Sequence, residues 1–197
     1  MGNAATTRQL IIEKSAMLFN KKGYAGTTLQ DLTKSIRLTK GSLYGNFKNK
    51  EEIALEAFRF NFQQLGTRIS TYVSQESGAV NQLFALTRFY RQDFDVMTYL
   101  GGCPLMNAAT DADDTNEGLR QEVTRAFEAV IGVITGIIEA GQYSKEIKSG
   151  VVAANYGVLF FSLIEGGVLL SKTMNRKQYL YEACDRIDKI IQDELRV

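Results

Sequence analysis

The chain has 197 residues, enough for one domain or two small ones, and 45% of them are hydrophobic, which is ample for a buried core. It contains no histidine, which excludes Ser-His-Asp and Cys-His catalysis and the usual zinc sites. The net charge is only +1, but residues 1–50 carry +7 (nine Lys and Arg against two Asp and Glu) and the remainder carries −6, a split that favours a polyanion-binding head on an acidic body.

A first helix is predicted from about Arg8 to Lys22. Thr6 and Gln9 have the spacing of a capping box at its start, and Gly23 stands where glycine commonly ends a helix. Its apolar positions recur at the helical period: Ile12, Ala16 and Phe19, with Leu18 beside them.

Residues 27–47 read as two short helices joined by a tight turn near Arg37. Thr27 or Thr28 would cap the first helix, and Thr39 would cap the second, which is expected over Lys40 to Phe47. The positions predicted to point inward share one apolar face in each helix: Leu29, Leu32 and Ile36 in the first, Leu43 and Phe47 in the second.

The second helix would show only small, polar and basic residues on its outer side. These outward residues are Lys40, Gly41, Ser42, Tyr44 and Asn46. Such a surface suits the DNA major groove, and the helix N-terminus favours phosphate. The alternative is an ordinary helical hairpin with a solvated face.

A long helix is expected to begin after Asn49, a good cap, and to continue to about Ser74. Lys48 and Lys50 precede or open it, close enough to the preceding helix to contact phosphate. Such contacts would position the protein on DNA without reading bases.

Residues 8–55 resemble the DNA-binding domain of the TetR family of bacterial transcriptional regulators. The matching runs are I-x-x-x-A-x-x-L-F-x-x-x-G-Y from Ile12, T-T-L-Q-D-L from Thr27 and L-T-K-G-S-L-Y-x-x-F-x-x-K-E-E from Leu38. The resemblance implies an all-α protein of about nine helices, with a three-helix helix-turn-helix head (1–50) and a ligand-binding and dimerisation body (51–197). The DNA-binding residues would then be Thr27, Thr28, Thr39, Lys40, Gly41, Ser42, Tyr44, Asn46, Lys48 and Lys50.

Two residues depart from the family pattern. Arg37 stands where the family usually has glycine, and a left-handed backbone there would cost about 1 kcal/mol. Asn46 stands where the family usually has histidine, so the base preference is expected to differ.

Downstream, a helix is predicted over 79–97, followed by a break at Gly101 and Gly102 and a short helix from about Pro104. A helix over about 115–140 would end at Gly141. Four acidic residues precede or open that helix: Asp111, Asp113, Asp114 and Glu117. They lack the glycine and terminal glutamate spacing of a calcium loop, so a solvated acidic turn is preferred and no metal is expected.

Residues 151–170 are the most apolar run and are long enough to span a bilayer, but Asn155, Ser162 and Glu165 interrupt them. Burial in a helical body is therefore preferred. The last helix, about 176–195, is amphipathic. By resemblance to the family, the homodimer interface is placed at about 151–195, with Gly166 and Gly167 allowing close backbone approach.

A ligand pocket is expected among the aromatic residues of the body and near the glycine break. Each candidate is also a plausible core residue: Phe58, Phe62, Phe84, Phe89, Tyr99, Cys103, Phe127, Tyr156 and Phe160. Cys103 opens a helix, where thiol reactivity rises, and G-C-P-L resembles the motif of family members that sense electrophiles or oxidants. Lys172 is its candidate neighbour, and the alternative is a small buried residue without chemistry.

The predicted function is a homodimeric repressor that leaves a palindromic DNA operator when a small-molecule effector binds the body. One form of this prediction is an effector that reacts with a thiol. The alternatives are a transcriptional activator and an effector-independent DNA-binding protein; an enzyme is not expected, and neither is a cofactor. Two cysteines make no disulfide framework and no signal peptide is evident, so a cytoplasmic protein is expected.

Overall fold

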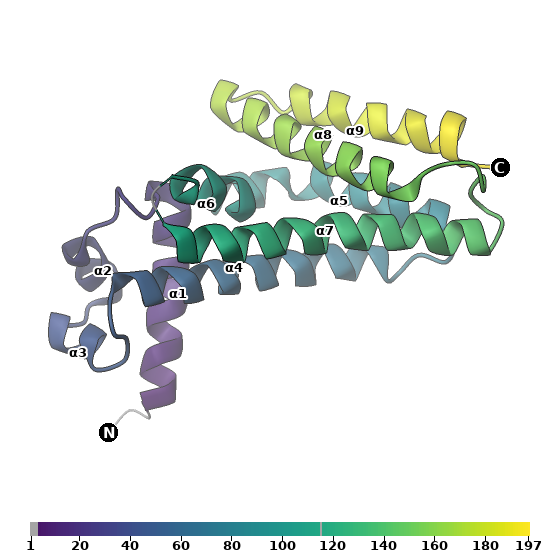
Figure 1. Cartoon of the computed structure of the whole chain (residues 1–197). Helices are drawn as coiled ribbons and strands as arrows, with labels where there is room; N and C mark the ends of the chain where they lie inside the picture. Colours follow the sequence, from purple (N-terminus) through teal and green to yellow (C-terminus); the bar gives the residue numbers. More distant parts are fainter. Residues whose placement is uncertain (1–3, 115) are drawn as a thin grey trace. The chain divides into compact units, whose positions relative to one another are not determined.

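The computed structural model describes residues 4–114 and 116–197, and every regular element in these ranges is a helix (Figure 1). The predicted all-α fold class is confirmed, with nine α-helices in the described ranges. The chain divides into two compact units, one formed by residues 1–65 and 100–125 and the other by residues 66–99 and 126–197.

The first unit holds the N-terminal helices together with α6. Its helices are α1 (Ala4–Lys22), α2 (Leu29–Ile36), α3 (Lys40–Tyr44), α6 (Pro104–Ala112) and the first parts of α4 (Lys50–Val73) and α7 (Glu117–Tyr143). The unit therefore extends past the boundary predicted at residue 50 and takes in a later segment. The division into 1–50 and 51–197 remains a prediction about function.

The helix α1 begins earlier than predicted, at Ala4 instead of Arg8. Thr6 consequently lies inside the helix, so the predicted capping box with Gln9 is wrong. The Gln9 side-chain amide instead donates to Glu13 Oε1 at 3.0 Å, one turn further along the same helix. The C-terminal end is as predicted, because Gly23 adopts a left-handed conformation with φ of 76°.

Thr28 caps α2 in a reciprocal capping box. The Asp31 N–H donates to Thr28 Oγ1 at 3.1 Å, and the Thr28 N–H donates to Asp31 Oδ2 at 2.9 Å. Lys22 Nζ lies 2.8 Å from Asp31 Oδ1, and these bonds hold the pKa of the Asp31 carboxyl well below its usual range. Of the two threonines considered as the cap, Thr28 is therefore the one, and Thr27 is buried and donates to the Gly23 carbonyl.

Arg37 ends α2 in the left-handed conformation, with φ of 61° and ψ of 38°. We therefore expect Arg37→Gly to stabilise the protein by about 1 kcal/mol, since glycine has no Cβ to clash in this conformation. The thermal midpoint should rise by about 2–4 °C, measured by circular dichroism. Lys34→Gly, at a regular helical position of α2, is the control and should lower the midpoint. A fall with Arg37→Gly would contradict the expectation.

The N-terminal helices share one apolar core. Leu43 and Phe47 point inward as predicted, Ile12 and Ala16 are buried on α1, and Phe19 is half-buried beside them. The fully assembled cluster contains Ile11, Ile12, Leu32, Ile36, Leu43, Phe47 and Ile53. Because α2 and α3 are too short to be stable alone, this burial is what holds them in place.

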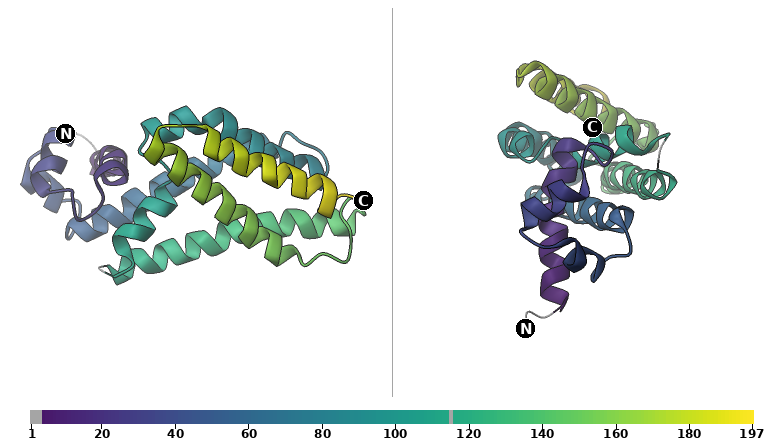
Figure 2. Two further views of the ribbon diagram at one scale, coloured as in Figure 1. Left: turned by 90° about the horizontal axis from the view of Figure 1, so that it is seen from above. Right: turned by 90° about the vertical axis from the view of Figure 1, so that its left-hand side faces the viewer.

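The second unit contains α5 (Ala79–Tyr99), α8 (Ala153–Met174), α9 (Gln178–Ile190) and a final π-helical turn (Ile191–Leu195), with the remainders of α4 and α7. Figures 1 and 2 show α8 and α9 side by side. Gly167 permits this packing, because a Cβ there would lie 3.0 Å from the Cα of Leu180 and the Cβ of Ala183. A Cβ on Gly166 would have no neighbour within 4 Å in this chain.

The helix α7 does not end at Gly141 as predicted but runs on to Tyr143. Gly141 is buried, and a Cβ there would approach the side chains of Ile147 and Ala79 to 2.6 and 2.7 Å. The glycine therefore serves close packing and not helix termination. Thr115, the predicted first residue of this helix, lies outside the described residues.

The helix α8 is long and apolar enough to cross a membrane by length and composition alone, with a mean hydropathy of 1.5 over its most apolar window. In the structure 44% of that window is buried. Buried residues include Phe160, Ile164 and Val168, which face the interior of the second unit. The helix thus has one interior face and one exposed face.

Candidate nucleic-acid interface

The helix α3 is short, and its two ends are fixed by local contacts. Thr39 caps its start, accepting from the Ser42 N–H at 3.1 Å. It ends at Tyr44, earlier than the predicted Phe47, because Gly45 and Asn46 form a turn. Leu43 within α3 is fully buried, so the opposite side of the helix must face solvent.

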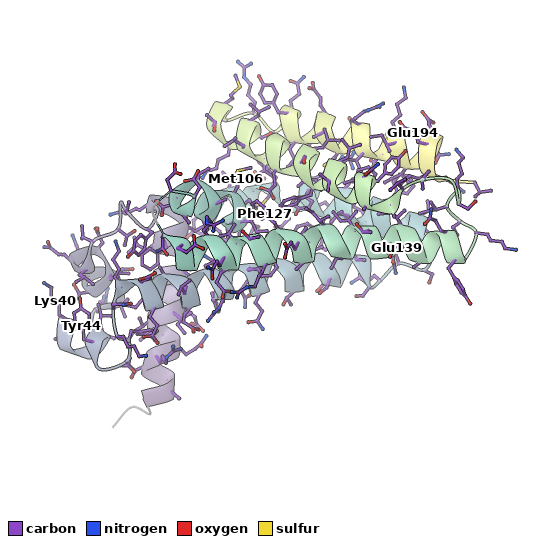
Figure 3. All side chains as sticks on the ribbon, in the orientation of Figure 1. Lys40, Tyr44, Met106, Phe127, Glu139 and Glu194 are labelled. Atoms are coloured by element: carbon purple, nitrogen blue, oxygen red, sulfur yellow. The ribbon has the colours of Figure 1, made fainter. Side chains whose placement is uncertain are left out.

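That opposite side carries the predicted recognition residues. Figure 3 shows Lys40 and Tyr44 pointing away from the ribbon, and Tyr44 is 48% exposed although it is aromatic. Gly41 is also exposed, and Ser42 is half-buried beside the Thr39 hydroxyl at 3.2 Å. The side chains of Lys40 and Tyr44 make no hydrogen bond within the described part of the chain. They are therefore available to a ligand.

The remaining predicted contacts differ in how accessible they are. Thr28 and Lys48 are exposed, whereas Asn46 is half-buried and its amide donates to the Ser42 carbonyl at 2.8 Å. Thr27 is 0% exposed, so the prediction that its side chain faces DNA is corrected: the side chain belongs to the interior. Lys50 Nζ lies 2.5 Å from the Tyr24 carbonyl oxygen, and a phosphate contact would require that bond to break.

Further basic side chains surround α2 and α3. Lys34 and Arg37 are exposed, and the sequence-based prediction omitted both as contacts. The sequence signals that identify them as contacts are their positive charge and their positions, on the last turn of α2 and in the turn before α3. By contrast Arg8 is engaged, with its guanidinium 3.3 Å from Glu52 and 4.5 Å from the centre of the Phe47 ring. The exposed cations give this surface a positive field that favours phosphate.

Family models match most of the chain. Residues 11–57 match the model described as "Bacterial regulatory proteins, tetR family", and residues 79–187 match "Tetracyclin repressor-like, C-terminal domain". The chain belongs to the TetR family. It is therefore a transcriptional regulator with a helix-turn-helix and not an enzyme, because the family and the named relatives are regulators.

Solved structures and a curated relative agree over nearly the whole length. A TetR transcriptional regulator from Chloroflexus aurantiacus has a TM-score of 0.95 and 28% identity, covering 100% of both chains. A TetR-family regulator from Cytophaga hutchinsonii has a TM-score of 0.94 and 31% identity, covering 100% of this chain and 98% of that one. The HTH-type transcriptional repressor DhaR of Mycobacterium sp. (strain GP1) is 24% identical over 88% of this chain and 86% of its own.

The residues predicted to line a ligand pocket are distributed over both units. Phe58, Phe62 and Cys103 belong to the first unit. The others belong to the second: Phe84, Phe89, Tyr99, Phe127, Tyr156 and Phe160. Phe89 and Phe160 are fully buried, whereas Tyr99 is 69% exposed at the end of α5. A pocket formed by this set stays a prediction.

A small cavity lies in the first unit beside Phe58. Its volume is about 30 Å³, and its lining combines apolar groups with the side chains of Asn20, Asn61, Asn107 and Asp111. That volume holds about one or two water molecules and is too small for an aromatic effector.

The acidic residues before α7 do not form a metal site. No group of three or more potential metal-ligating side chains occurs among the described residues. The prediction of a solvated acidic turn is wrong for Asp111, because its carboxylate accepts from the backbone N–H groups of Tyr24 and Ala25. Asn116 caps α7, accepting from the Leu119 N–H at 3.0 Å.

Both thiols are buried: Cys103 is 2% exposed at the start of α6, and Cys184 is 0% exposed in α9. Desolvation raises the pKa of Cys184 to about 12, so the unreactive thiol form dominates at pH 8. Lys172, the residue predicted to lie beside the Cys103 thiol, belongs to the other unit.

We therefore expect neither thiol of the native protein to react with iodoacetamide at pH 8 in the time that alkylates both in guanidinium chloride. The measurement is the intact mass at successive times. Rapid single alkylation of the native chain at Cys103 would contradict this expectation and would favour a thiol sensor.

Proposed function

We propose that this chain is a homodimeric transcriptional repressor that places α3 of each subunit in the major groove of a palindromic DNA operator. The carrying observation is the exposed side of α3, which presents Lys40 and Tyr44 while Leu43 anchors the helix from behind. The remaining contacts would come from Thr28, Thr39, Gly41, Ser42, Asn46 and Lys48. Repression is proposed because the relative DhaR is named a repressor.

A dimer is proposed for a physical reason as well. One short helix reaches too few base pairs for specific binding, whereas a two-fold pair reaches two half-sites. The proposed interface lies within residues 151–195. Its centre is the exposed face of α8, where apolar side chains flank the small residues Ser162 and Gly166: Val158, Leu159, Leu169 and Leu170.

The exposed face of α8 is proposed to be covered by the same face of a second copy. Exposed apolar side chains lie about one turn away on each side of Ser162 and Gly166, and such small residues let helices approach closely. Two-fold related copies would bury their apolar faces together without any further partner. A cytoplasmic location is part of the proposal, since the DNA is there.

Release from DNA is proposed to follow binding of a small molecule by the body of the protein. The ligand would need to favour one spacing of the two heads over another, because a ligand with equal affinity for both states shifts nothing. Burial of Cys103 argues against a thiol-reactive effector acting on this conformation. An activator, or a regulator without effector, would use the same DNA-binding surface.

The proposal is tested by sedimentation of the full chain with a labelled pool of duplex DNA at several salt concentrations. We expect two chains per bound duplex and an affinity that falls steeply as salt rises, because lysine and arginine displace condensed cations. Binding by one chain, or affinity independent of salt, would refute it.

A further inference from the structure

The linker between α1 and α2, residues 23–28, is held by a side chain from outside the helix-turn-helix. The carboxylate of Asp111, in α6, accepts from the N–H of Tyr24, and its other oxygen accepts from the N–H of Ala25 at 3.5 Å. Backbone N–H groups in a linker have no helical partner and need an acceptor. Asp111 supplies it from 86 residues further along the chain.

Gly23 leaves the space that the carboxylate occupies. A Cβ built on Gly23 would lie 3.2 and 3.3 Å from the two carboxylate oxygens of Asp111. The same residue has a φ of 76°, which side chains disfavour. Glycine at this position therefore both turns the chain and admits Asp111.

Lys50, the first residue of α4, also binds the linker, through its contacts with Tyr24. Its Nζ donates to the Tyr24 carbonyl oxygen at 2.5 Å and lies 4.1 Å from the centre of the Tyr24 ring. Partial burial lowers the pKa of the Lys50 ammonium, and the negative charge of Asp111 opposes that shift. Both polar groups of the Tyr24 backbone are thus bonded to side chains outside the linker.

Two asparagines fix the end of α1 to the start of α6. Asn107 donates to the backbone carbonyl of Asn20 at 3.0 Å and to that of Gly101 at 2.8 Å. Asn20 donates to the carbonyls of Leu100 at 2.8 Å and Gly102 at 3.2 Å. This network of uncharged hydrogen bonds keeps α6 beside α1. It therefore holds Asp111, which lies on α6, next to the linker.

We propose that Asp111 is a positioning residue for DNA recognition: by holding the N–H groups of Tyr24 and Ala25, it sets the direction in which the chain enters α2 and hence the placement of α3. The inference rests on the proposed DNA-binding function. It extends the recognition machinery to a residue far from the helix-turn-helix in sequence, which touches no DNA itself.

Charge and geometry predict opposite effects when this carboxylate is removed. Removing a negative charge near a basic surface should by itself strengthen binding to DNA. If Asp111 positions the linker, Asp111→Ala should instead weaken specific binding by about tenfold. A tenfold loss is expected if the linker keeps its DNA-binding conformation in only about one molecule in ten. Affinity for random duplex should not fall, and the slope of log affinity against log salt should stay unchanged, because no phosphate contact is lost.

The experiment measures the fluorescence anisotropy of a selected operator and of a random duplex, each at three salt concentrations. Asp113→Ala is the matched control, since Asp113 is exposed, two residues away and of the same charge. It should bind as tightly as the parent or slightly more tightly. Asp111→Asn keeps the size and one acceptor oxygen, so it should lie between Asp111→Ala and the parent, and it carries the test if the alanine variant fails to fold.

The outcomes separate the two proposals. If the parent prefers no duplex over random DNA, the proposed function fails. If the parent binds specifically and the folded Asp111 variant binds as tightly as Asp113→Ala, the positioning role is refuted. A loss of operator and random-duplex affinity to the same extent would also refute it, since that pattern indicates a general loss of folded protein.

Discussion

Tyr44→Ala is expected to weaken binding to a specific operator by at least about 30-fold, with the dimer and the thermal midpoint unchanged. Tyr44 is 48% exposed on α3 and its side chain makes no hydrogen bond within the described chain, so removal of that side chain costs the fold little. A good base contact contributes about 1–3 kcal/mol, and a dimer loses two of them. The measurement is operator affinity by fluorescence anisotropy, with sedimentation to verify the dimer.

Tyr143→Ala provides a matched control for this variant. Tyr143 is 93% exposed at the end of α7, in the second unit, and is not a proposed DNA contact. Its replacement should leave operator affinity as in the parent. Lys40→Ala should weaken binding as Tyr44→Ala does. If neither Lys40→Ala nor Tyr44→Ala changes affinity, α3 is not the helix in the groove.

Leu169→Glu is expected to convert the dimer into monomers and, with it, to abolish specific DNA binding. Leu169 is 49% exposed on α8, within the apolar face that we propose the second copy covers. Two-fold symmetry would bring two uncompensated carboxylates into an apolar interface. Each unpaired buried charge costs about 3 kcal/mol or more, so two of them should weaken the dimer by more than about ten-thousandfold.

The control for the dimer variant is Val133→Glu, a similar change at an exposed apolar residue of α7. It should remain dimeric by sedimentation equilibrium and bind the operator like the parent. A Leu169→Glu chain that stays dimeric would place the interface elsewhere. If instead the parent is monomeric and associates with lipid vesicles, the exposed face of α8 serves a membrane and the dimer proposal is wrong.

Local features were predictable from the sequence because their causes lie within a few residues. The spacing of Leu43 and Phe47 predicted which side of α3 is buried, and Thr39 predicted where it begins. Thr28, one of the two predicted caps of α2, does cap it, and Arg37 has the left-handed conformation for which the sequence predicts a cost in stability. The exposed side of the recognition helix follows from these features without further information.

Features that depend on distant segments were missed. Nothing near Asp111 in the sequence indicates that it binds the backbone at Tyr24, and the local pattern alone predicts a solvated turn. The hydrogen bond from Lys50 to the Tyr24 carbonyl likewise joins residues far apart in the sequence. Gly141 resembled a helix end because its actual reason, packing against Ile147 and Ala79, appears only when the helices are assembled.

The most direct test of the central claim is to select bound sequences from random duplex DNA with the full-length protein. If two basic heads act as a two-fold pair, the enriched sequences will contain two inverted copies of one short half-site, with centres one DNA turn of about 10 base pairs, or a multiple of it, apart. Failure to enrich any sequence, or enrichment of a single unrepeated half-site, would contradict the account.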